Sequence, residues 1–215
     1  MSQKNSFLNL LKKYQVIAII RTQQMELSRK IARATAAGGI NLIEIPWNDD
    51  WAASLIEKLR SELPECTIGT GTLLNLDHVQ QALVAGAQFL FSPKVDIELI
   101  KATAEQDIPF IPGALSPTEI LAAWQAGASV VKVYPIQAVG GVSYIEILKG
   151  PLGHIPLIPT GGVTVENAKD FLAAGAIAVG LAGDLFPKAV VEAGDWGAIT
   201  QRVCTLTKRL PTPAP

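Results

Sequence analysis

Short runs of apolar residues alternate along the chain with longer stretches in which apolar residues recur at helical spacing. Each short run is almost entirely apolar, as expected of parallel strands that are covered on both faces. We therefore expect eight strands. They are Val16–Arg21, Leu42–Trp47, Thr67–Thr72, Phe89–Pro93, Pro109–Ala114, Val130–Pro135, Leu157–Gly162 and Ala176–Ala182.

Several of the longer stretches close on a glycine that leads directly into the next run, as in "VAGAQFLFS" and "QAGASVVKV". A glycine at that point is typical of a helix C-terminus. Eight strand–helix units in one chain predict a (β/α)8 TIM barrel, and an open doubly wound sheet is the alternative. The dinucleotide-binding form of that alternative would need a GxGxxG turn after the first strand, and the sequence has none there.

One further helix is expected before the first strand, around Ser6–Tyr14. Its apolar residues Phe7, Leu8 and Leu11 share one face, so we expect it to cover the lower end of the barrel. A chain of 215 residues suits a single domain of this fold, which we place at residues 1–210. The final segment, "PTPAP" at residues 211–215, has no periodic apolar face and is expected to be a disordered tail.

Composition excludes several classes of function. The chain has 18 basic and 19 acidic residues and no basic block, so neither nucleic acid nor an anionic membrane is an expected partner. No apolar stretch approaches the roughly 18 residues of a membrane span. Cys66, Cys204, His78 and His154 are isolated, so no metal or redox spacing is present. The N-terminus lacks the features of a signal peptide, and we expect a cytoplasmic protein.

Two charged residues lie inside apolar runs: Glu44 in "LIEIPW" and Lys132 in "VVKVYP". In a barrel, the second and sixth strands face each other, so the two side chains are expected to converge at the mouth. One interpretation is a buried ion pair without further function. A second is a desolvated, neutral lysine that forms a Schiff base, with the carboxylate moving protons. A third is a lysine that binds phosphate.

Glycine turns follow the seventh and eighth expected strands, in "PTGGVTVEN" (residues 159–167) and "GLAGDLF" (residues 180–186). Phosphate sites of barrels often form at these two positions, where free backbone N–H groups at a helix start can hold the anion. Thr164 is expected to cap the helix that follows the first turn, with Asn167 three residues later. Two ordinary glycine turns without a ligand are the alternative interpretation.

The chain resembles the 2-keto-3-deoxy-6-phosphogluconate (KDPG) / 4-hydroxy-2-oxoglutarate (KHG) aldolases over about residues 16–200. The segments that carry the resemblance follow in family order: "AGGINLIEIPWN", "IGTGTLLN", "AGAQFLFSP", "PFIPGALSPTE", "VKVYPIQAVGG", "GPLGHIPLIPTGGV" and "EAGDW". The resemblance implies a class I lyase with a (β/α)8 fold, a homotrimer, and a small keto-acid substrate. It implies no metal and no coenzyme, because the protonated imine is the electron sink.

Within the resemblance, Lys132 matches the Schiff-base lysine and Glu44 the general acid/base. Other residues match groups that bind the substrate. They are Arg21, Asn48, Thr72, Pro93, Thr160, Gly161, Gly162, Ala182 and Gly183. Two positions depart from the family pattern. Asn48 stands where many members have an arginine for the carboxylate, and Gly183 stands where a serine is common in the phosphate turn.

The expected reaction is cleavage of KDPG to pyruvate and glyceraldehyde 3-phosphate, with KHG cleavage to pyruvate and glyoxylate as a second activity. The segment "EIPWN" looks more like the phosphogalactonate (KDPGal) branch, so KDPGal aldolase is the alternative. A phosphate-binding barrel isomerase or epimerase is a more distant one, and a sugar-phosphate-binding protein without activity is the alternative from outside the enzymes.

Overall fold

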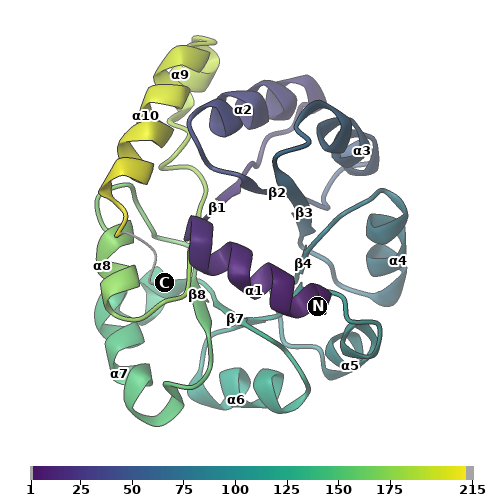
Figure 1. Ribbon diagram of the computed structural model, residues 1–215, viewed down its shortest axis with the longest axis vertical. Helices are drawn as coiled ribbons and strands as arrows, with labels where there is room; N and C mark the ends of the chain where they lie inside the picture. Colours follow the sequence, from purple (N-terminus) through teal and green to yellow (C-terminus); the bar gives the residue numbers. More distant parts are fainter. Residues whose placement is uncertain (1, 212–215) are drawn as a thin grey trace.

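The computed structural model describes residues 2–211, and strands alternate with helices throughout. The strands lie around a common centre with the helices outside them, except for one helix that crosses one end (Figure 1). The strands are β1 (Val16–Ile19), β2 (Leu42–Pro46), β3 (Thr67–Gly71), β4 (Leu90–Phe91), β5 (Phe110–Ile111), β6 (Gly113–Ala114), β7 (Val131–Val133), β8 (Leu157–Pro159) and β9 (Val179–Leu181).

The helices fill the stretches predicted for them. They are α1 (Gln3–Tyr14), α2 (Met25–Ala37), α3 (Ala52–Glu62), α4 (Leu76–Val84), α5 (Ile97–Glu105), α6 (Pro117–Gln125), the 3-10 helix η1 (Ile136–Val139), α7 (Val142–Leu152), α8 (Ala168–Ala173), α9 (Lys188–Glu192) and α10 (Trp196–Arg209). Gly86 and Gly127 follow α4 and α6 with φ of +87° and +108°, the left-handed region that glycine enters without a steric penalty. The glycine helix ends predicted from the sequence are therefore present.

All strand pairs are parallel, and they form two sheets. One has the order β5-β4-β3-β2-β1-β9 and the other β6-β7-β8. A bridge between Thr160 and Gly180, and a hydrogen bond of 3.0 Å from the Ile177 N–H to the Leu157 carbonyl, connect the end of the second sheet to the first. The α/β class and the parallel arrangement are thus confirmed as a curled sheet covered by helices.

The fifth expected strand is divided in two, which is why residues 2–211 form nine strands where eight were expected. Pro112 separates β5 from β6 because proline has no N–H to donate to the neighbouring strand. Its carbonyl still accepts a hydrogen bond of 2.9 Å from the backbone N–H of Lys132. The division therefore leaves β7 hydrogen-bonded to this segment at Lys132.

Helix α1 covers the end of the sheet at which the strands begin. Phe7 stacks on Phe89 with ring centroids 5.0 Å apart, and Leu11 is fully buried in the same cluster. The cluster also contains Leu42, the first residue of β2. The predicted lower-end helix is confirmed, although it begins at Gln3 because the Ser2 hydroxyl accepts a hydrogen bond from the N–H of the third helical residue. The opposite end, where strands finish, is left for the site.

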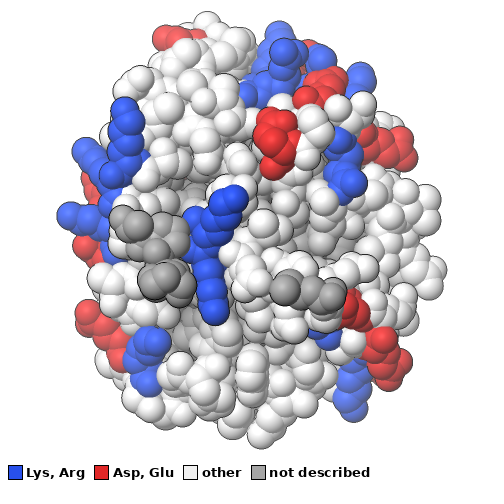
Figure 2. All heavy atoms as spheres, viewed as in Figure 1, with Lys and Arg blue, Asp and Glu red and all other residues white. Residues whose placement is uncertain are grey.

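Basic and acidic side chains are interspersed on the face that carries α1, and most of that face is uncharged (Figure 2). No helix among residues 2–211 is long and apolar enough to span a bilayer. The expectation of a disordered tail at 211–215 falls mainly on residues 212–215, which lie outside the described residues.

Candidate active site

Glu44 lies in the middle of β2 and Lys132 in the middle of β7. These two strands lie on opposite sides of the common centre (Figure 1). The exposed fractions of Glu44 and Lys132 are only 1% and 7%, so both charges are buried as the sequence predicts. The Lys132 Nζ lies 4.8 Å from the ring centroid of Tyr134 and 5.4 Å from that of Phe91. Aromatic faces attract a cation but supply no hydrogen bond, so this amine has a largely apolar setting.

The two buried groups are not joined as a simple ion pair. Within residues 2–211, no oxygen of Glu44 lies within 4.0 Å of the Lys132 amine, and the Glu44 Oε2 is buried without a hydrogen-bond partner. Unpartnered buried oxygens are rare, because each costs about 1–3 kcal/mol. The carboxylate is therefore placed to bind something other than the lysine.

Burial shifts both groups toward their neutral forms. Desolvation is the main cause that raises the pKa of Glu44, and the nearby charges of Lys132 and Arg21 oppose it. Desolvation likewise lowers the pKa of Lys132; the Glu44 charge opposes this shift and the Arg21 charge adds to it. A neutral amine can act as a nucleophile, and a carboxyl with a raised pKa can both give and accept a proton.

Gly71, the last residue of β3, makes the room that the Glu44 carboxylate occupies. A Cβ at position 71 would collide with the Glu44 Oε1 and lie 2.6 Å from its Cδ. The next residue, Thr72, has a φ of +66°, a strained conformation for a β-branched residue. Sequence reasoning selected Thr72 but missed Gly71. The segment "IGTGTLLN" contains the signal, since a glycine inside a strand often marks a close approach.

Thr160 follows β8, and its hydroxyl is a second buried oxygen without a partner. It lies directly beside Gly180 of β9, where any Cβ would collide with it. The side chain of Ile19 borders the same glycine, 3.2 Å from the position of a Cβ. Thr160 and Glu44 are thus both buried hydrogen-bonding groups left open for a polar ligand.

The first glycine turn lies against the aromatic ring that faces the lysine. Gly161 and Gly162 have φ of +80° and +105°, and a Cβ on Gly161 would lie 3.1 Å from the ring of Tyr134. Tyr134 therefore contacts both the turn and the Lys132 amine. It was not selected from the sequence, because an aromatic residue after a strand is more often a packing residue.

The second turn is held by backbone hydrogen bonds. The N–H of Leu185 donates to the carbonyl of Ala182 at 3.0 Å, and that of Phe186 to Gly183 at 3.2 Å. The helix expected to follow at once, α9, starts only at Lys188.

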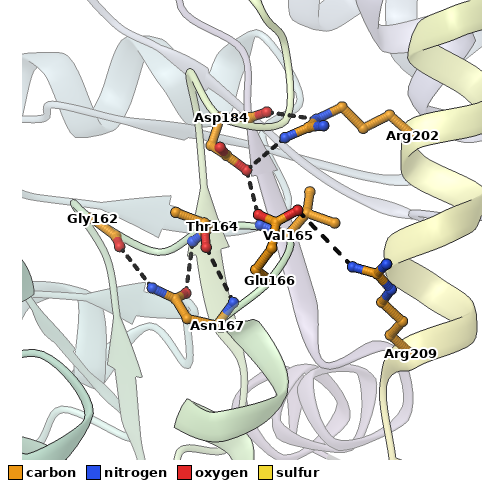
Figure 3. A network of polar contacts seen from close by, with 8 residues as sticks. All are labelled: Gly162, Thr164, Val165, Glu166, Asn167, Asp184, Arg202 and Arg209. Atoms are coloured by element: carbon orange, nitrogen blue, oxygen red, sulfur yellow. Dashed lines mark hydrogen bonds and ion pairs between the residues drawn. The ribbon is translucent and has the colours of Figure 1, made fainter.

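Thr164 caps a turn rather than α8 itself, which begins at Ala168. Its hydroxyl accepts from the Asn167 N–H at 3.1 Å, and the Asn167 Oδ1 accepts from the Thr164 N–H at 2.7 Å (Figure 3).

The other predicted residues lie farther out. Arg21 is exposed and borders a cavity of about 400 Å³ together with Ala182 and Gly183. Asn48 borders a different cavity of about 410 Å³, on the side of α3 and α4. The backbone of Pro93 packs against Gly113, where a Cβ would lie 2.7 Å from its carbonyl. Residues 2–211 contain no group of three or more His, Cys, Asp and Glu side chains that could hold a metal.

Comparisons with known proteins agree with this geometry. The family model for KDPG and KHG aldolase matches residues 8–202. The KHG/KDPG aldolase of Escherichia coli K12 is 33% identical over 186 residues, which cover 86% of this chain and 87% of the relative.

Two solved structures are also similar. The first is the KDPG aldolase of Legionella pneumophila with pyruvate captured as a covalent carbinolamine intermediate. It superposes with a TM-score of 0.85 at 27% identity, covering 93% of this chain and 97% of that one. The second is a native KDPGal structure, with a TM-score of 0.80 at 28% identity and coverage of 90% and 92%.

Proposed function

Since the chain belongs to the KDPG and KHG aldolase family, we propose that it is a class I aldolase that cleaves KDPG to pyruvate and glyceraldehyde 3-phosphate. The observation that carries the proposal is the buried Lys132 amine, whose pKa is lowered by desolvation and which lies near a buried carboxylate without forming an ion pair with it. Binding alone does not require such a lysine. Burying an amine costs free energy of folding, and groups with strongly shifted pKa values cluster at functional sites.

In the proposed mechanism, the neutral Lys132 amine attacks the C2 ketone and forms a carbinolamine. Glu44 supplies the proton with which the C2 hydroxyl leaves as water, and the protonated imine results. The resulting carboxylate takes the proton from the C4 hydroxyl as the C3–C4 bond breaks. The electron pair of that bond moves into the imine and gives an enamine, while the aldehyde departs. Protonation of C3 and hydrolysis of the imine then release pyruvate.

The remaining residues are proposed to hold the substrate. The hydroxyls of Thr72 and Thr160, with Arg21, orient its carboxylate and hydroxyl groups, and Pro93 and Asn48 line the approach. The unpartnered hydroxyl of Thr160 supports this assignment. The turns at Gly161–Gly162 and Ala182–Gly183 are proposed to hold the phosphate with backbone N–H groups.

KDPGal aldolase is the second candidate, and Asn48 is the observation that favours it. An asparagine there cannot provide the two-pronged contact to a carboxylate that an arginine makes. The solved KDPGal structure resembles this chain as closely as the KDPG structures do in sequence identity. Cleavage of KHG to pyruvate and glyoxylate is proposed as a side activity of the same site.

We also propose that residues 1–210 form one domain in which the two sheets close as a (β/α)8 barrel. The bridge from Thr160 to Gly180 supports closure on one side, and the continuity of β5 and β6 through Pro112 supports it on the other. We further propose that the protein forms a homotrimer and is located in the cytoplasm. The two free cysteines, Cys66 and Cys204, are compatible with a reducing compartment.

Borohydride reduction in the presence of pyruvate tests the proposal. The expected result is a stable pyruvyl adduct on Lys132, located by peptide mass analysis. Lys94→Met is the matched control, because Lys94 follows β4 but is exposed and paired with Asp96 at 2.8 Å. An active enzyme that forms no adduct on Lys132 would refute the Schiff-base mechanism. Parallel assays on KDPG, KDPGal and KHG then identify the preferred substrate.

A further inference from the structure

The side chain of Asp184 connects the two glycine turns. Asp184 follows Gly183 in the second turn, and its Oδ2 accepts a hydrogen bond of 2.8 Å from the backbone N–H of Val165, just beyond the first turn. Figure 3 shows this contact between the β9 loop and the β8 loop. The two loops are therefore pinned together by one carboxylate.

Arg202 of α10 holds that carboxylate in place. Its terminal nitrogen donates to the Asp184 Oδ2 at 3.0 Å, and its Nε donates to the Asp184 backbone carbonyl at 2.8 Å. Two bonds from one planar guanidinium fix both the side chain and the peptide of residue 184. The arginine also offsets a negative charge that would otherwise repel an anion at the neighbouring Gly183.

Asn167 holds the first turn in the same network. Its Nδ2 donates to the carbonyl of Gly162 at 3.2 Å, and its Oδ1 accepts from the backbone N–H of Thr164 at 2.7 Å. Both turns are thus tied to fixed partners, one through Asn167 and the other through Arg202 (Figure 3). Among residues 2–211, the bond from Asp184 to Val165 is the side-chain hydrogen bond that joins the two turns, and it lies beyond the backbone bridge from Thr160 to Gly180.

We propose that Asp184, held by Arg202, is a positioning residue that sets the distance between the two glycine turns and thereby the preference for a phosphorylated substrate. This inference rests on the proposed function, in which those turns bind the phosphate. Asp184 does not act on the reacting carbon, so it should affect binding of phosphorylated substrates and leave the chemistry at Lys132 unchanged.

The test compares kcat and KM for KDPG with those for 2-keto-3-deoxygluconate, the same sugar acid without phosphate. In Asp184→Ala, the KM for KDPG is expected to rise about tenfold, as for a lost charge-assisted hydrogen bond. Its kcat, and both constants for the substrate without phosphate, should stay near those of the wild type. Asp184→Asn retains an acceptor for Val165 and Arg202, so its KM for KDPG should stay within about twofold of the wild type.

Arg202→Gln should reproduce the KM effect, and it provides a second variant if Asp184→Ala does not fold. Lys208→Gln is the matched control, because Lys208 is an exposed cation on the same helix, and its replacement removes the same charge as Arg202→Gln. Equal losses on both substrates would reveal a merely structural role and overturn the inference. Unchanged KM values in Asp184→Ala and Arg202→Gln would overturn it as well.

The wild-type enzyme separates failure of this inference from failure of the proposed function. A wild type that forms the Lys132 adduct and prefers KDPG, with variants that keep that preference, refutes only the role of Asp184. A wild type that treats both substrates equally refutes the phosphate site and the inference with it. An active wild type without the adduct refutes the Schiff-base mechanism itself.

Discussion

Replacement of Gly71 by alanine is expected to disable catalysis by displacing Glu44. The φ of Gly71 lies outside the left-handed region, so the backbone itself accepts an alanine. The added Cβ would lie 2.6 Å from the Glu44 Cδ and 3.3 Å from its Cγ, and it would collide with the Oε1. Carbon atoms prefer a separation of about 3.5–4.0 Å, so the carboxyl group must move by about 1 Å.

A displacement of about 1 Å at a catalytic group can lower the rate by about 100-fold. We therefore expect Gly71→Ala to lower kcat for KDPG cleavage by about two orders of magnitude. Overpacking should also lower the free energy of unfolding by about 1–3 kcal/mol. Lys132 is not displaced, so borohydride should still trap pyruvate on it, although more slowly.

A coupled assay for pyruvate measures kcat, and thermal unfolding measures stability. Gly150→Ala is the matched control, since Gly150 lies in α7 and no atom lies within 4 Å of a Cβ there. It should keep full activity and gain up to about 1 kcal/mol of stability. A folded Gly71→Ala enzyme with the kcat of the wild type would refute the reasoning, because the position of the Glu44 carboxylate would then be unimportant.

Three further predictions follow from the same structure. The rate of pyruvate trapping should rise with pH and level off below the pH at which an ordinary lysine titrates, because desolvation lowers the pKa of Lys132; Arg21→Gln should shift this profile to higher pH. Burial raises the pKa of Glu44, so the wild type loses stability as the pH rises through that pKa. Glu44→Gln does not titrate, so its Tm relative to that of the wild type should increase as the pH rises above the usual glutamate pKa. Phe7→Ala should cost about 3–5 kcal/mol of stability at an unchanged kcat, whereas the exposed control Lys12→Ala should cost less than about 0.5 kcal/mol.

The sequence predicts the α/β arrangement well, because parallel strands that are covered on both faces consist of short runs of apolar residues. Each expected strand contains an observed one, and the face of Phe7 and Leu11 correctly predicts a covering helix. The division at Pro112 is less evident, since proline is tolerated where a donor is not needed. Whether the runs build one sheet or two depends on single hydrogen bonds that no periodicity encodes.

The two central residues of the site are evident from the sequence for a different reason. Burying a charged side chain inside an apolar run costs desolvation free energy. Glu44 and Lys132 are therefore conspicuous in the sequence as residues that need a function or a partner. Gly71 and Tyr134 were missed because their importance lies in what they touch, which only the folded chain reveals. The role of Asp184 was missed for the same reason.

The position of α10 separates the control of selectivity from the bond-breaking step along the chain. Thr200 anchors the helix to the Ala34 carbonyl of α2 at 3.0 Å, and Arg202 reaches the loop after β9. During synthesis, Glu44 and Lys132 leave the ribosome long before Arg202 does. Arg202 lies downstream of both reacting residues, on a separate helix. Substitutions in α10 can therefore retune the accepted substrates and leave untouched the segments that contain Glu44 and Lys132.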